Sequence, residues 1–102
     1  MNTHLKMYVL VRKDLDPTYR CVQGTHAVAE YILYYPELAE KWGNSTLVFL
    51  GVRFPKGLRE WHDKLEGAQK KFVAFFEPDQ DEQITAIACL DDGRIFKDLR
   101  TV

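Results

Sequence analysis

The chain has 102 residues, which is enough for one domain and too few for two. It is 46% hydrophobic and 28% charged, and it has no run of about 18 to 20 apolar residues that could span a membrane, so a globular domain is expected. The formal net charge of −1 argues against a generic nucleic-acid binder. The sequence still allows a local basic surface at the mouth of a site, because Arg12, Lys13 and Arg20 flank one turn.

The cysteine content and the N-terminus both favour a cytoplasmic protein. Cys21 and Cys89 have no short-range pairing pattern, which is typical of thiols in a reducing compartment. The apolar run after Lys6 is too short for the hydrophobic region of a signal peptide. We therefore expect two buried free thiols without a metal or redox role.

The first half of the chain predicts a strand followed by a helix. Residues Met7 to Arg12 are almost continuously apolar, as in a central strand covered on both faces. Asp16 and Pro17 suit the N-cap and the first position of a helix, which Pro36 ends or kinks. Apolar or small residues recur at helical spacing and predict its buried stripe: Val22, Thr25, Ala29, Ile32 and Leu33.

The second half predicts a further helix and three more strands. Leu58, Trp61 and Leu65 form the inner stripe of a helix that closes at Gly67. The other expected elements are a short helix from Glu37 to Trp42 ended by Gly43-Asn44, and strands at Ser45 to Val52, Lys71 to Glu77 and Ile84 to Leu90. An acidic loop, Pro78 to Gln83, joins the last two strands as a hairpin. The order indicates one α/β domain with a four-stranded mixed sheet, and it leaves the tail from residue 94 open between an edge strand and a helical turn.

Two segments resemble the type II peptidyl-tRNA hydrolases. The first strand ends in Arg12-Lys13-Asp14-Leu15, and the helix carries Gln23-Gly24-Thr25-His26-Ala27. In that family a hydrophobic strand ends in Arg-x-Asp-Leu and the next helix carries Gln-x-x-His-Ala. Thr85-Ala86-Ile87-Ala88 is similar to the family's final Thr-x-x-Ala strand. The resemblance implies the peptidyl-tRNA hydrolase II fold across residues 1–102, a small mixed sheet with helices packed on its faces.

The resemblance also implies an activity, the cofactor-independent hydrolysis of the ester in peptidyl-tRNA or a related acyl ester. Such a reaction needs an activated water, a stabilised oxyanion and a held tRNA end. By resemblance, Glu77 or alternatively Asp79 would activate the water. The remaining implied site residues are His26 and Thr85 with catalytic roles, and Gln23, Asp14, Tyr19, Arg20 and Lys13 with substrate-binding roles. The N-terminus of the first helix would offer free N–H groups to an anion. The family habit further implies a homodimer, with no membrane.

Two alternatives to hydrolysis of peptidyl-tRNA stay open. Tyr19 stands where the family has a lysine, and the loop after Glu77 is shorter and far more acidic than in the family, so it would repel tRNA phosphates. His26 is also explained by a structural role, bonded to Glu30 one turn on or to the backbone. The chain could therefore be a binding or regulatory module that kept the fold and lost the lysine, or a different small-molecule hydrolase.

Overall fold

The protein is described by a computed structural model that covers residues 4–80 and 83–102. Its helices and strands are, in chain order, β1 (Lys6–Arg12), α1 (Pro17–Tyr34), α2 (Pro36–Trp42), β2 (Leu47–Val52), α3 (Pro55–Gly67), β3 (Phe72–Glu77) and β4 (Gln83–Asp91), with 3-10 turns η1 (Pro78–Gln80) and η2 (Arg94–Phe96). The sheet order is β2-β1-β4-β3. β1 runs parallel to β2 and antiparallel to β4, and β3 pairs antiparallel with β4. The predicted α/β class and four-stranded mixed sheet are confirmed.

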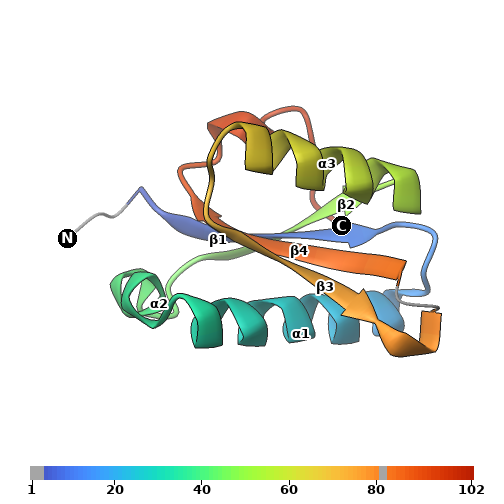
Figure 1. Ribbon diagram of the computed structural model, residues 1–102, viewed down its shortest axis with the longest axis horizontal. Helices are drawn as coiled ribbons and strands as arrows, with labels where there is room; N and C mark the ends of the chain where they lie inside the picture. Colours follow the sequence, from blue (N-terminus) through green and yellow to red (C-terminus); the bar gives the residue numbers. More distant parts are fainter. Residues whose placement is uncertain (1–3, 81–82) are drawn as a thin grey trace.

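The molecule has three layers, with α1 and α2 on one face of the sheet and α3 on the other (Figure 1). The side chains of successive residues of β1 point to opposite faces of the sheet, because side chains alternate along a strand. Val9 and Val11 pack with Ala27 in the α1 layer, whereas Leu10 packs with Leu58 in the α3 layer. Cover on both faces explains why the first strand reads as one continuous apolar run.

The ends of the helices follow local sequence chemistry. The Asp16 side chain accepts hydrogen bonds from the backbone N–H groups of Thr18 and Tyr19, at 3.0 and 3.2 Å, which confirms Asp16 as the N-cap. Pro36 begins α2 directly after α1 ends. Gly43 closes α2 with a left-handed φ of 62°, which glycine adopts without steric cost.

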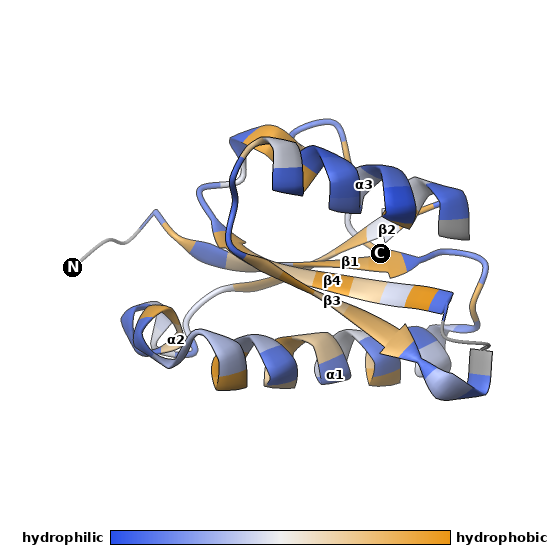
Figure 2. Ribbon diagram, in the orientation of Figure 1, coloured by the Kyte–Doolittle hydropathy of each residue, from blue (hydrophilic) through white to orange (hydrophobic). Residues whose placement is uncertain are grey.

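The predicted buried stripe of α1 is wrong. All five of its residues are exposed, among them Val22 by 44%, Ile32 by 42% and Leu33 by 79%. The buried face instead consists of Gln23, Gly24, Ala27 and Tyr31. Gly24 lets the helix approach the sheet closely, since a Cβ there would lie 2.8 Å from Phe49 Cζ and closer still to Cε2. The apolar periodicity predicted that the more apolar face of α1 would be buried. In the structure that face points away from the sheet, where Figure 2 shows orange bands on α1.

The chain after β4 covers one edge of the sheet. The tail returns to β2, where Thr101 forms an antiparallel bridge with Leu50. The backbone N–H of Gly51 donates to Arg100 O at 3.0 Å, and that of Val102 donates to Phe49 O at 3.2 Å. The tail therefore forms both of the elements that the sequence left open, first a helical turn at η2 and then a short pairing at the edge of the sheet.

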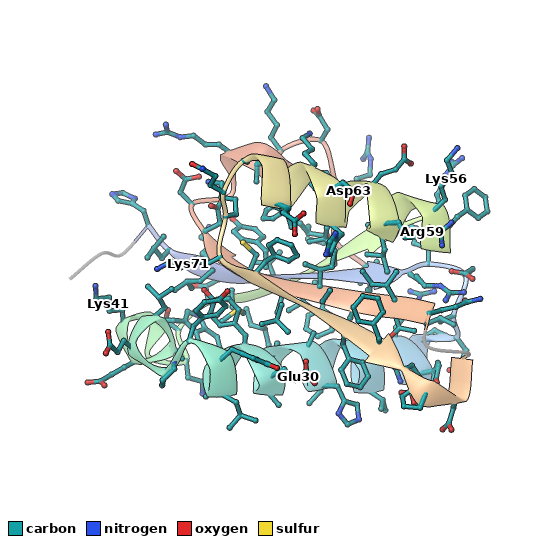
Figure 3. All side chains as sticks on the ribbon, in the orientation of Figure 1. Glu30, Lys41, Lys56, Arg59, Asp63 and Lys71 are labelled. Carbon is teal, nitrogen blue, oxygen red and sulfur yellow. The ribbon has the colours of Figure 1, made fainter. Side chains whose placement is uncertain are left out.

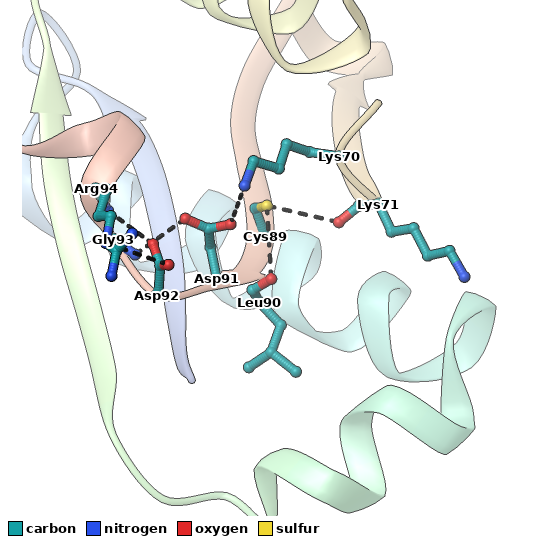
Figure 4. A network of polar contacts seen from close by, with 8 residues as sticks. All are labelled: Lys70, Lys71, Cys89, Leu90, Asp91, Asp92, Gly93 and Arg94. Carbon is teal, nitrogen blue, oxygen red and sulfur yellow. Dashed lines mark hydrogen bonds and ion pairs between the residues drawn. The ribbon is translucent and has the colours of Figure 1, made fainter. Parts of the chain in front are cut away.

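A polar network lies at the C-terminal end of β4 (Figure 4). Lys70 Nζ donates to Asp91 Oδ1 at 2.8 Å, and Asp91 Oδ2 accepts the N–H of Gly93 at 2.9 Å. The neighbouring Cys89 is buried, whereas Cys21 is exposed on α1, so the expectation of two buried thiols holds only for Cys89. Within the described residues, no helix is long and apolar enough to cross a membrane.

Candidate functional site

A β-bulge aims Thr85 at α1. Phe75 pairs with Ala86 but Phe76 pairs with Ile84, so Thr85 is an extra residue on β4 that has no register partner on β3. Such a bulge redirects the side chain that it carries. Thr85 is fully buried, and its Oγ1 donates to Gln23 Oε1 at 2.6 Å. The bulge thus brings the predicted Thr85 to the predicted Gln23.

The Gln23 amide links this hydroxyl to a carboxylate. Its Nε2 donates to Glu77 Oε2 at 2.9 Å, and Glu77 Oε1 accepts the backbone N–H of Asp79 at 3.2 Å. The two bonds fix which end of the amide carries the nitrogen. We call Thr85, Gln23 and Glu77 the polar relay, because hydrogen bonds join them in series across β4, α1 and β3.

Glu77 is the member of the polar relay that reaches solvent. Gln23 and Thr85 are buried, whereas Glu77 is half-buried and is the last residue of β3 before the turn η1. A carboxylate in this setting can take a proton from a water at its open side. Gln23 and Thr85 orient that carboxylate, and they contact a substrate only if the relay opens.

Arg12 forms a second cluster beside the polar relay. Its Nε and Nη2 donate to the two oxygens of Asp14, at 3.0 and 2.6 Å, and its Nη1 donates to Gln83 Oε1 at 3.1 Å. The hydrogen bonds from Arg12 lower the pKa of Asp14. Gln83 is the register partner of Glu77 across β3 and β4, which places this cluster next to the relay. Arg12 was not a predicted site residue, although an arginine ending a buried strand is unusual enough to mark it.

The other two predicted cations, Arg20 and Lys13, contact groups outside the polar relay. The Arg20 guanidinium donates to Leu15 O at 2.9 Å and to Lys13 O at 3.1 Å, so it braces the loop between β1 and α1. The Lys13 side chain lies over Gly51, where a Cβ would come within 2.8 Å of its Cγ. Gly51 is on β2 and Glu77 on β3, the opposite edges of the sheet.

The N-terminus of α1 offers less to an anion than its sequence predicted. Asp16 accepts the N–H groups of Thr18 and Tyr19, so two of the donors expected to be free are occupied by the cap. Tyr19 itself is half-buried in the first turn. A phosphate or oxyanion would have to compete with a carboxylate for these groups.

His26 belongs to the outer surface of α1. Its ring is exposed and stacks on Phe75 of β3, with ring centroids 4.7 Å apart and an interplanar angle of 4°. It lines a shallow groove of about 450 Å³ with Cys21, Val22, Thr25 and Ala29. The structure therefore separates His26 from the buried polar relay one turn earlier on the helix.

A second groove lies on the α3 side of the sheet. It has a volume of about 400 Å³ and is lined by Arg59, His62, Asp63, Phe76, Gln83 and Ile84. Figure 3 shows Arg59 and Asp63 on α3, in the layer opposite to the one that carries Glu30. Within residues 4–80 and 83–102, no three His, Cys, Asp or Glu side chains gather in a way that could hold a metal ion. Asp81 and Glu82 of the acidic loop lie outside the described residues.

Comparison with solved structures gives a neighbour of the same architecture. The fold is similar to that of Atu0240, a protein of unknown function from Agrobacterium tumefaciens strain C58, with a TM-score of 0.72 over 99% of both chains. The sequences are 14% identical, so this likeness shows the fold alone. No family model matches the chain, and no curated protein matches it.

Proposed function

We propose that the chain is a cofactor-independent ester hydrolase that acts on peptidyl-tRNA or a related acyl ester at Glu77. The observation that carries the proposal is the 2.9 Å hydrogen bond from Gln23 Nε2 to Glu77 Oε2, between residues 54 positions apart. The family resemblance assigns both residues to one site. A half-buried carboxylate with a fixed amide partner suits the activation of water.

In this mechanism Glu77 takes a proton from water as that water attacks the ester carbonyl. The bond between the acyl carbon and the ester oxygen then breaks, and the leaving hydroxyl oxygen receives the proton that Glu77 holds. Thr85 fixes Gln23, and Gln23 in turn fixes the carboxylate, so the base is held in one orientation. Tyr19 stands in the sequence where the family has its lysine. Because a phenol carries no positive charge, we expect turnover about two to three orders of magnitude below that of a lysine-containing site, as for a lost oxyanion donor.

A second candidate is a binding or regulatory module on the same fold. Arg20 donates to backbone carbonyls of the loop between β1 and α1, and Lys13 lies over β2, so both candidates for the missing positive charge have contacts outside the polar relay. A buried relay can also serve stability alone, since buried polar groups need partners.

Release of free tRNA from N-acetylated aminoacyl-tRNA separates these functions. We expect slow cleavage by the wild-type protein and at least about tenfold faster cleavage by Tyr19→Lys, because the added ammonium stabilises the oxyanion. Tyr34→Lys, at an exposed tyrosine of the same helix, is the matched control and should leave the rate unchanged. If neither the folded wild type nor Tyr19→Lys cleaves this substrate, the binding module is favoured. Cleavage of a short acyl ester alone would favour the small-molecule hydrolase.

A further inference from the structure

The strand β3 forms an open edge of the sheet. In the part of the chain that the structure describes, β3 pairs with β4 on one side, and no other segment forms backbone hydrogen bonds with its second side. In Figure 1 β3 crosses in front of β4, with α3 above it and α1 below it. A single neighbouring strand uses the N–H and C=O groups of alternate residues, so β3 still presents a row of free donors and acceptors.

The sequence of β3 lacks the residues that usually protect such an edge. From Phe72 to Phe76 it reads Phe-Val-Ala-Phe-Phe, without a charged residue or a proline, and Phe76 is 48% exposed. The opposite edge of the sheet differs, because there the tail covers β2 through the bridge between Thr101 and Leu50. An uncovered apolar edge rich in Phe and Val is a template for one more strand.

The groove on the α3 side of the sheet lies along the same strand. Phe76 lines it together with Arg59 and His62 of α3. The His62 ring also meets Phe72 edge to face, with ring centroids 5.2 Å apart. Phe72 and Phe76 therefore share the α3 face, four residues and about 13 Å apart along the strand. If a further strand pairs with β3, every second side chain of that strand points toward this groove.

The charges of the groove favour an acidic strand. Among the described residues the Arg59 guanidinium has no hydrogen bond or ion pair, whereas Asp63 Oδ1 lies 3.1 Å from His62 Nδ1. Figure 3 labels Arg59 and Asp63 on α3, the helix that forms this wall of the groove. A guanidinium binds a carboxylate through two parallel hydrogen bonds. An acidic side chain thus meets an unpaired cation here, and a basic one meets a carboxylate that already has a partner.

We propose that β3 is the docking site for an extended acidic peptide segment of a partner protein, which joins the sheet as an added strand. The main chain of the segment pairs with the open edge of β3. An apolar side chain packs against Phe76 in the groove, and a carboxylate two residues along the segment binds Arg59, because alternate residues share a face. The interface is one strand wide, so we expect a dissociation constant of about 1 to 100 μM. The inference does not depend on the proposed hydrolysis.

An NMR titration of the full chain with the peptide acetyl-TVTLTETV-amide tests the docking site, since its Leu and Glu share one face. We expect the shifts to centre on β3 and α3, and Arg59→Glu to weaken binding at least about tenfold. Lys64→Glu is the matched control, because Lys64 lies over the Trp61 ring on the same helix and does not line this groove. It should change the dissociation constant less than about threefold. The peptide with Lys in place of Glu should bind Arg59→Glu better than it binds the wild type. No shifts at about 1 mM peptide, or equal effects of both variants, would overturn the proposal.

N-methylation of the peptide tests whether it binds as a strand. Two versions carry methyl groups on alternate amide nitrogens, so one blocks the donors that face β3 and the other blocks the donors that face away. We expect one version to bind at least about tenfold more weakly and the other to bind like the parent peptide. Equal affinity of the two versions would contradict strand addition. If the free chain sediments as a dimer that Phe76→Lys dissociates, the edge belongs to a second copy and the proposal is overturned.

Discussion

Gln23 donates a 2.9 Å hydrogen bond to Glu77, and this bond joins the middle of α1 to the end of β3. Thr85 fixes the other end of the same amide. A buried amide held at both ends tolerates little change, since a lost partner leaves a polar group unpaired. The polar relay therefore contributes to stability and to the proposed chemistry through the same contacts.

Gln23→Glu should be strongly destabilising at neutral pH. The new carboxylate would be buried against Glu77, at an expected cost of about 2 to 4 kcal/mol. Repulsion and burial raise its pKa in the folded state, so the cost should shrink as the pH falls toward 4 and the group is protonated. Urea denaturation at pH 7 and pH 4 measures both effects. Gln69→Glu, the same change at an exposed turn, should cost less than about 0.5 kcal/mol.

Gly24→Ala and Gly67→Ala should have effects of opposite sign. At Gly24 the added methyl group would meet the Phe49 ring and approach Val9, so we expect a loss of about 1 to 3 kcal/mol despite the better helix propensity of alanine. At Gly67, the end of α3, no atom lies within 4 Å of the added group, and we expect a gain of about 0.5 kcal/mol. Thermal unfolding of both variants checks the pair. Stabilisation by Gly24→Ala would contradict close packing of α1 on the sheet.

Local chemistry predicted more of this structure than long-range packing did. The apolar run of β1 and the Asp16 cap lie within a few residues of the elements that they define. The buried face of α1 was mistaken because the exposed face, with Val22, Ile32 and Leu33, is more apolar than the face of Gln23, Gly24 and Ala27 that meets the sheet. Only the tertiary fit of Gly24 against Phe49 decides between the two faces.

Part of the candidate site could likewise be predicted from the sequence, and part depends on long-range packing. The family resemblance pointed to Gln23, to Thr85 and to either Glu77 or Asp79. The fold joins Gln23, Thr85 and Glu77 from three elements. The bulge that aims Thr85 depends on the register of β3 against β4, which no local pattern specifies. The positions of Lys13 and Arg20 could not be predicted either, because long side chains reach in several directions from one backbone position.

The two thiols should differ sharply in reactivity. Cys21 is exposed, whereas Cys89 is buried and its pKa is raised to about 12 by burial, with the nearby Asp91 carboxylate adding to the effect. The thiolate is the reactive form, so the native protein should show one fast thiol toward a disulfide reagent near pH 8. Cys21→Ala should remove that fast phase, and the remaining thiol should react only after unfolding. A fast phase that survives Cys21→Ala would contradict the burial of Cys89.

Stability should fall in alkaline solution, and Tyr31 should account for part of the loss. Burial is the largest cause that raises the pKa of Tyr31 to about 12 from 10.0. Between these values the unfolded chain loses the phenol proton while the folded chain keeps it, so ionisation favours unfolding as the pH rises from 10 to 12. Tyr31→Phe keeps the ring and removes the proton. Denaturant titrations at pH 8 and pH 11 should show a smaller loss for Tyr31→Phe than for the wild type, and equal losses would refute this assignment.

The most direct test of the hydrolytic site is single-turnover cleavage of N-acetylated aminoacyl-tRNA by Glu77→Gln. The variant keeps an acceptor for Gln23 but cannot take a proton from water, so we expect its rate to fall at least about 100-fold below the wild type. Glu66→Gln, the same change at an exposed position of α3, should retain the wild-type rate. A Glu77→Gln variant that cleaves as fast as the wild type, or a loss that falls on Asp79→Asn instead, would contradict the assignment of Glu77 as the base.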